Sequence, residues 1–205
     1  MKDQVTQEYR HFLAEVVSWA FFPPLVGTVF FIFLLFWYSK DISQGLQWMI
    51  FVAPFLLFLP LIFFAVSYKL GWVSDIDLSN REERPIFLLV FVISLLAASI
   101  VLFFLHVPTK LFVYVFSGLI MTAVTSFITL YWKISFHTAA TTSVVTAINI
   151  LGGLRFAPLF LLIPIIAWAR LVLRKHSLLQ VIGGFVVALI ITEVIFYLFG
   201  FPIFI

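Results

Sequence analysis

Histidine and arginine side chains gather in three polar segments of an otherwise apolar chain. These segments cover residues 74–85, 133–138 and 169–180. Together they hold two histidines and three arginines that are candidate site residues: His137, His176, Arg81, Arg84 and Arg170. Arginine offers a planar fork of N–H donors that matches phosphate oxygens. A neutral imidazole can attack phosphorus, and a protonated one can donate to the leaving oxygen. The residue types therefore indicate chemistry on a phosphate dianion.

The spacing inside the third segment suggests how its side chains are arranged. Arg170 and His176 are six positions apart, so we expect them to straddle a helix end and a turn rather than share one helix face. Gln180 is four positions after His176, which is the spacing of neighbours on a helix face. A side chain at that position can accept a hydrogen bond from the imidazole N–H. We therefore expect Gln180 to fix the tautomer of His176.

The composition indicates the class of protein that must position these residues. The chain has 205 residues, of which 64% are hydrophobic and only 10% are charged, whereas soluble domains are about half apolar and a quarter charged. This difference excludes an ordinary soluble globule, a disordered chain and a nucleic-acid binder. The absence of cysteine excludes a disulfide scaffold, a thiol nucleophile and thiolate metal sites. We therefore predict a polytopic membrane protein.

Long apolar runs predict the elements. A membrane-spanning helix needs about 20 mainly apolar residues. The chain has seven candidate runs: Leu13–Tyr38, Leu46–Tyr68, Pro85–Val107, Lys110–Trp132, Thr138–Leu151, Phe156–Val172 and Leu178–Phe201. The fifth run is short and unusually polar. The prediction is an all-α bundle of six or seven transmembrane helices, with residues 13–205 as one domain after a polar lead-in at residues 1–12.

The order of spans also predicts where the polar segments lie. Two runs separate each polar segment from the next, and a hairpin of two spans returns the chain to the same membrane surface. We therefore expect the three segments to meet at one interface. With seven spans, that face and the amino terminus carry nine Lys and Arg residues against three on the other face. The positive-inside rule places the motif face in the cytoplasm of a multi-pass cell-membrane protein.

The first two polar segments resemble signature motifs of the type 2 phosphatidic acid phosphatase family, integral-membrane enzymes that dephosphorylate lipid phosphates. Arg84-Pro85 matches the end of the first motif, in which Asp77 stands where the family has Lys. Ser135 and His137 match the second motif, while isoleucine and phenylalanine replace its Pro and Gly. The family's fold is consistent with the predicted helical membrane bundle.

The third segment extends this resemblance to roughly residues 70–200. Ala169-Arg170 and His176 match the third motif, and Gln180 replaces its Asp. A glutamine can accept a hydrogen bond, but it cannot offset the charge of an imidazolium. Asp75 or Asp77 in the first segment is a candidate to supply the missing carboxylate and orient the imidazole.

The resemblance implies a role for each matched residue. His176 would be the nucleophile that forms a phosphohistidine, and His137 the general acid for the leaving lipid hydroxyl. Arg84 and Arg170 would hold phosphate oxygens, with Ser135 as an added donor, and no metal or other cofactor would be required. The expected partner is a membrane lipid phosphate: a phosphomonoester or diphosphate of a polyprenyl or phosphatidate-like lipid.

Two other functions remain open on the sequence. The first is a non-catalytic membrane protein that binds lipid phosphate or scaffolds a complex, since the motifs depart from the family at several positions. The second is a magnesium-dependent prenyltransferase, in which Asp75 and Asp77 would hold a metal-bound diphosphate. The run from Asp75 to Pro85 is somewhat similar to the Asp-rich first motif of intramembrane aromatic prenyltransferases. Those enzymes carry a second Asp-rich loop, and this chain has none.

Overall fold

Helices make up the whole described fold. The computed structural model describes residues 2–73 and 81–203, and the regular elements in these ranges are all helical. The α-helices are, in chain order, α1 (Lys2–Ala20), α2 (Pro23–Tyr38), α3 (Ile42–Ala53), α4 (Leu59–Lys69), α5 (Arg84–Phe104), α6 (Thr109–Tyr131), α7 (Phe136–Gly152), α8 (Leu162–Val172) and α9 (Leu178–Leu198). Shorter helical segments precede three of them: η1 (Pro54–Phe58) before α4, η2 (Arg81–Glu83) before α5 and η3 (Leu154–Leu161) before α8.

The helices are those of a multi-pass membrane protein. Five segments of the described chain are long and apolar enough to cross a membrane: Ile42–Lys69, Arg84–Phe104, Thr109–Tyr131, Leu154–Val172 and Leu178–Leu198. A sixth crossing is possible if Gln4–Ala20 and Pro23–Tyr38, which are bent by 44° at the break between them, form one span. The expected all-helical membrane bundle is confirmed. The bundle has five or six candidate membrane-spanning segments by length and composition, whereas the sequence predicted six or seven.

Among these segments the fifth predicted run is absent; it forms α7. It has 17 residues, and a spanning helix needs about 20. It packs against α2, α6, α8 and α9, and most of its side chains are buried. Several of these are hydroxyls: Thr138, Thr141, Thr142, Ser143 and Thr146. Small polar side chains let membrane helices approach closely, so α7 is the enclosed central helix of the bundle.

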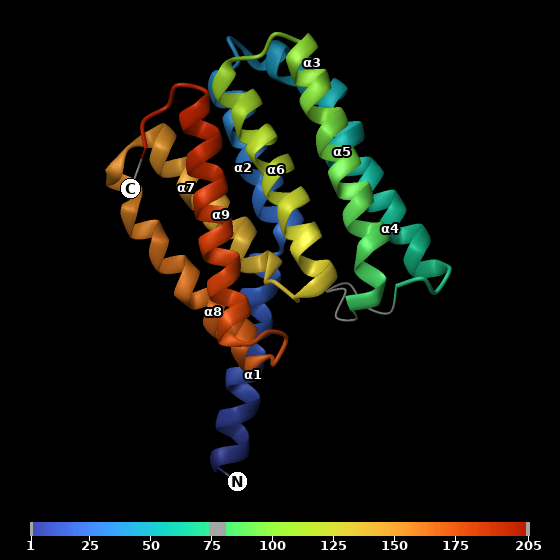
Figure 1. Cartoon of the computed structure of the whole chain (residues 1–205), viewed down its shortest axis with the longest axis vertical. Coiled ribbons are helices and arrows are strands. Elements are labelled where there is room, and N and C mark those ends of the chain that lie inside the picture. The colour runs from blue at the N-terminus through green and yellow to red at the C-terminus, as the bar shows by residue number, and fades with distance from the viewer. Residues whose placement is uncertain (1, 74–80, 204–205) are drawn as a thin grey trace.

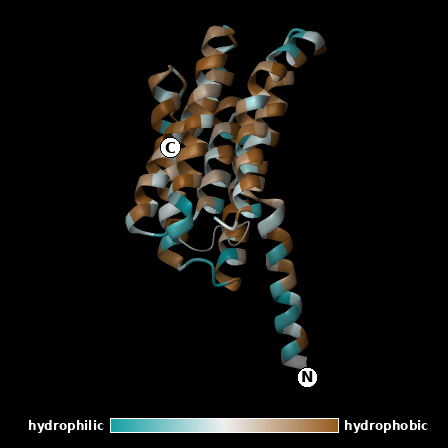
Figure 2. Cartoon of the chain, turned by 90° about the vertical axis from the view of Figure 1, so that its right-hand side faces the viewer, coloured by the Kyte–Doolittle hydropathy of each residue, from teal (hydrophilic) through white to brown (hydrophobic). Residues whose placement is uncertain are grey.

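The chain runs back and forth so that alternate connections share one end of the bundle. The α1–α2 junction, η2 before α5, the α6–α7 connection and the α8–α9 connection all lie at the lower end in Figure 1. Polar residues also gather at this end and along α1, which extends beyond the bundle (Figure 2). The expectation that a two-span hairpin returns each polar segment to one interface therefore agrees with the arrangement of the described helices.

Close packing between α7 and α9 fixes the start of α7. A Cβ added at Gly184 of α9 would lie 2.6 Å from the carbonyl oxygen of Ser135. The main-chain N–H of Ser135 in turn donates to the carbonyl of Gln180, one turn earlier on α9, at 3.2 Å. Both contacts involve the main chain, which cannot move aside as a flexible side chain does. Gly184 therefore allows α9 to contact the residues that lead into His137.

We expect Gly184→Ala to destabilise the fold by about 1–3 kcal/mol, because the added methyl overpacks this contact. Gly118→Ala is a matched control, since Gly118 is also inside a helix and its added Cβ would meet nothing within 4 Å. The control should be neutral or slightly stabilising. The measurement is the thermal unfolding of both purified variants in the same detergent. Equal unfolding temperatures for the two would show that the α7–α9 contact is not tight.

Candidate functional site

Four ionisable side chains from four parts of the chain are buried at the lower end of the bundle. Arg84 is the first residue of α5, His137 the second of α7, Arg170 lies in the last turn of α8, and His176 lies between α8 and α9. None of the four is more than 9% exposed. We call these four residues the cationic cluster. They are also the four residues whose convergence the sequence predicted.

A serine of α1 connects two members of the cluster. The Nη1 atom of Arg170 donates a hydrogen bond to the Oγ atom of Ser18. The same Oγ lies 3.5 Å from Nε2 of His137, which is a long hydrogen-bond contact. Phe22, which follows α1, places its ring edge-on to the ring of His137, with 6.3 Å between centroids. Sequence reasoning missed Ser18, because one hydroxyl in an apolar run carries no spacing signal.

Burial and neighbouring positive charge keep both imidazoles neutral in this state. Burial, and then the charges of Arg170, Arg84 and Lys133, lower the pKa of His176 from 6.5 to about 3. Burial, followed by the charge of Arg170, also lowers the pKa of His137. Both imidazoles lie outside the segments identified as membrane crossings. The two guanidiniums act on both rings, so the four side chains form one electrostatic unit.

This shift predicts a pH dependence of stability. The folded protein keeps His176 neutral down to a pH of about 3, whereas the unfolded chain takes up a proton near pH 6.5. Folding stability should therefore be full above pH 6.5 and should fall as the pH drops from 6.5 towards 3. His176→Gln should weaken this acid-side dependence. The measurement is thermal unfolding in detergent across that pH range, and a variant with the wild-type slope would contradict the buried neutral imidazole.

The orientation of His176 comes from the main chain. Its Nδ1 atom lies 3.3 Å from the carbonyl oxygen of Lys133, which can only accept. The neutral ring therefore carries its proton on Nδ1, and Nε2 holds the lone pair. A nucleophilic histidine requires such an unprotonated nitrogen. No residue pattern indicates this contact, because a carbonyl is present at every residue.

Gln180 does not have the role that its spacing predicted. Its side-chain oxygen accepts from the main-chain N–H of Ser177 at 3.0 Å, and Ser177 Oγ accepts from the N–H of Gln180 at 3.4 Å. These two hydrogen bonds form a capping box at the start of α9. His176 lies before this cap, so the shared helix face assumed for residues 176 and 180 does not exist. The carbonyl of Lys133 has the expected role of Gln180.

Ser135 also has a structural role here. It is fully buried and is the N-cap of α7, where its Oγ accepts from the main-chain N–H of Thr138. Its Oγ also lies 3.1 Å from the hydroxyl of Thr138. These contacts hold the first turn of α7, and with it His137, in place. Its predicted donation to phosphate would require Oγ to turn from this partner.

The remaining predicted site residues are only partly covered. Asp75 and Asp77 lie outside the described residues, and the side chain of Arg81, at the start of η2, does too. Their predicted roles, as carboxylate orienters and phosphate ligand, remain predictions. In the rest of the chain, no group of three or more His, Asp or Glu residues is arranged to hold a metal ion.

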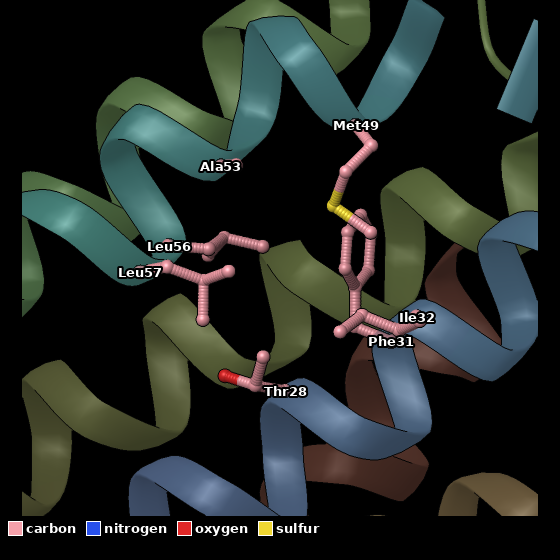
Figure 3. A pocket seen from close by; sticks show the side chains of 7 residues that line it. All are labelled: Thr28, Phe31, Ile32, Met49, Ala53, Leu56 and Leu57. Carbon is pink, nitrogen blue, oxygen red and sulfur yellow. The ribbon is translucent and has the colours of Figure 1, made fainter. Parts of the chain in front are cut away.

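Two hollows away from the cationic cluster are mainly apolar. The first lies between α2 and the α3–η1 segment and has no room for a water molecule (Figure 3). Its lining residues are Thr28, Phe31, Ile32, Met49, Ala53, Leu56 and Leu57. The second has a volume of about 230 Å³, lies beside the end of α9 and is lined in part by Glu193. Neither hollow is lined by a member of the cluster. The cluster itself is covered, since its four side chains are at most 9% exposed.

The fold and site define a polytopic helical membrane protein with a buried pair of arginines and a buried pair of histidines at one end. Comparison with known proteins adds no relative, since no family model, no curated protein and no solved structure matches the chain. The geometry of the cationic cluster is therefore the main observation that bears on function.

Proposed function

We propose that the protein is a membrane lipid phosphatase related in mechanism to the type 2 phosphatidic acid phosphatases. Its substrate would be a phosphomonoester or diphosphate of a polyprenyl or phosphatidate-like lipid. The observation that supports this most strongly is the meeting of Arg84, His137, Arg170 and His176, brought together from distant parts of the sequence. Two buried guanidiniums beside two neutral imidazoles are suited to a phosphate dianion, whose charge would compensate theirs.

The first chemical step would occur at His176. With Nδ1–H donated to the carbonyl of Lys133, the lone pair of Nε2 attacks phosphorus and forms the N–P bond. The bond from phosphorus to the lipid oxygen breaks, and its electron pair stays on that oxygen. Arg84 and Arg170 stabilise the negative charge on the transferring phosphoryl group. The product is a phosphohistidine and a lipid alcohol.

His137 would supply and then remove the proton. Burial, and after it the charge of Arg170, lowers the pKa of His137. Arrival of a phosphate dianion between the guanidiniums would offset the second of these causes, so the pKa of His137 would rise on binding. The protonated ring donates to the leaving lipid oxygen. In the second step the neutral ring takes a proton from water as the water oxygen attacks phosphorus, and the N–P bond breaks with its electron pair returning to Nε2 of His176. Inorganic phosphate is released, and both imidazoles return to their initial state.

The position of the cluster fits a lipid substrate. Its members lie at or near the ends of α5, α7 and α8, at the end of the bundle where polar residues gather (Figure 2). A lipid headgroup would meet the protein at such an end. The acyl or prenyl chain would stay in the bilayer while the phosphate enters between helix ends. We place this end on the cytoplasmic side of the cell membrane, because it and the amino terminus carry most of the Lys and Arg residues.

A second function, binding of lipid phosphate without turnover, is favoured by one observation. The Nδ1–H of His176 meets a main-chain carbonyl, where the resembling family has a carboxylate. A carbonyl orients the ring but cannot neutralise an imidazolium, so the phosphohistidine step would be slower. Gln180, which replaces that carboxylate in the sequence, caps α9 instead.

Phosphate release from purified protein in mixed micelles separates these functions. Wild-type protein should release inorganic phosphate from phosphatidate or from a polyprenyl phosphate, and a chelator should not prevent it. Binding of either lipid without release would support the non-catalytic function. Release or transfer that requires magnesium, and that is lost in Asp75→Asn and Asp77→Asn, would support the prenyltransferase alternative instead.

A further inference from the structure

Helix α1 contacts the bundle through a narrow face. Among the described side chains of α1, only Ala14 and Ser18 are fully buried, and they are one helical turn apart. This face packs against α8, the helix that carries Arg170. The rest of α1 is exposed apart from the partly buried Val17, and its first turns extend beyond the end of the bundle (Figure 1). The contact that holds α1 against the bundle is therefore mainly this one face on α8.

The hydroxyl of Ser18 occupies a position that a phosphate oxygen would need. Its Oγ accepts from Nη1 of Arg170 and lies within 3.5 Å of Nε2 of His137. These are the two atoms that would bind a phosphoryl oxygen and protonate the leaving group. The cluster is also covered, since its four side chains are at most 9% exposed. A phosphate oxygen can bind between Nη1 of Arg170 and Nε2 of His137 only after the Oγ of Ser18 has left that position.

The chain has a break at which α1 can move as a unit. The α-helices α1 and α2 meet at 44°, and Phe21 and Phe22 separate them. Pro23 and Pro24 follow, and proline has no N–H to continue the hydrogen-bond ladder of α1 into α2. The Phe22 ring contacts the ring of His137. Rotation at this break would therefore displace Ser18 and change the environment of His137 together.

We propose that α1 is a gate over the cationic cluster. In this structure the gate is closed, with Ser18 as an internal ligand of Arg170. A phosphomonoester on a membrane lipid replaces that ligand when α1 swings away from α8 at Phe21–Phe22. This inference rests on the proposed binding of lipid phosphate by the cluster. It adds that binding competes with an element of the chain itself, so that access is controlled from the amino-terminal helix.

Cysteine labelling tests the movement, because the chain has no cysteine of its own. Ala14→Cys places a thiol on the buried face of α1, and Gln7→Cys is the matched control on its exposed part. In phosphatidylcholine vesicles, a water-soluble maleimide should label Cys at position 14 slowly. Adding phosphatidate to the vesicles should raise that rate by about tenfold by shifting the population towards the open state. The control variant Gln7→Cys should label quickly in vesicles with and without phosphatidate.

Substitution of Ser18 tests the competition. Ser18→Ala removes the internal ligand and should tighten phosphatidate binding about threefold to tenfold. Ser18→Asp places a carboxylate against Arg170 and should weaken binding by more than about tenfold. If Ser18 merely positioned Arg170, Ser18→Ala would weaken phosphatidate binding instead.

The outcomes separate the gate from the proposed function. If wild-type protein binds phosphatidate but labelling at position 14 does not respond, or Ser18→Ala binds more weakly, the gate is wrong and the phosphate site stands. If wild-type protein binds neither phosphatidate nor a polyprenyl phosphate, both proposals are wrong. Inorganic phosphate serves as a further probe, since a response to it alone would show that the lipid chain is not needed to open α1.

Discussion

The variant His176→Ala is expected to lose phosphate release from lipid phosphates by about a thousandfold or more, because it removes the atom that would form the bond to phosphorus. Lipid binding should persist, since Arg84 and Arg170 remain. His176→Ala should also form no acid-labile phosphoryl adduct, whereas His137→Asn should still form one, more slowly, because the nucleophile remains. The measurements are released phosphate and protein-bound phosphate in the same reaction.

A histidine at the other end of the bundle provides the control. His106 follows α5, is exposed and has a φ of 49°. His106→Asn should leave release unchanged, because asparagine tolerates this left-handed backbone conformation. Phosphate release by His176→Ala at the rate of His106→Asn would rule out the phosphohistidine mechanism. Retained lipid binding in that case would leave only the non-catalytic function.

The fold was predictable where apolar runs and helix breakers agree. The sequence placed the third and fourth runs at Pro85–Val107 and Lys110–Trp132, and the helices are Arg84–Phe104 and Thr109–Tyr131. Proline accounts for this agreement. Pro85 lies in the first turn of α5, where its missing N–H costs nothing, and Pro108 is the N-cap of α6.

The first run was less predictable. Hydropathy predicts one span from Leu13 to Tyr38, with residues 1–12 as a separate lead-in. In the structure α1 begins at Lys2, includes most of that lead-in and ends at Ala20 before the bend. Hydropathy gives the total apolar length of a run but does not say where backbone hydrogen bonds stop. The polar start of α1 is helical although it lies outside any apolar run.

The site was predictable at the level of topology but not at the level of single hydrogen bonds. Counting spans brought Arg84, His137, Arg170 and His176 to one end, because the parity of crossings does not depend on helix boundaries. The role of Gln180 did depend on a boundary. The start of α9 at Leu178 puts His176 before the helix, and this difference turned a predicted ligand of the imidazole into a cap.

Contacts between remote parts of the chain were beyond sequence reasoning. Ser18 is 152 positions from Arg170 and 119 from His137, and neither spacing nor hydropathy connects such residues. The Lys133 carbonyl that orients His176 belongs to the main chain, which has no residue-specific signal. Both findings bear on the proposed function, since the Lys133 carbonyl orients His176, the proposed nucleophile, and Ser18 covers the proposed phosphate site.

The variant Arg170→Met is expected to separate function from stability. Arg170 is the largest of the side chains that are almost fully buried, and burying a charged group costs free energy even when it has partners. Replacing buried charged groups by well-packed apolar residues of similar volume is often neutral or stabilising. The unfolding temperature should therefore stay the same or rise. Affinity for phosphatidate should fall by about a hundredfold, the loss typical of truncating a buried charged donor.

The same variant should change the titration of His176. The charge of Arg170 is the largest contribution after burial to the lowered pKa of His176, so removing it should raise that pKa. An NMR titration of the imidazole in detergent would measure this. Arg174→Asn is the control: Arg174 is exposed in the same connection, with a φ of 52° that asparagine tolerates. If Arg174→Asn weakened binding as much as Arg170→Met, the connection would attract anionic lipid through its general positive charge, and the buried cluster would not be the phosphate site.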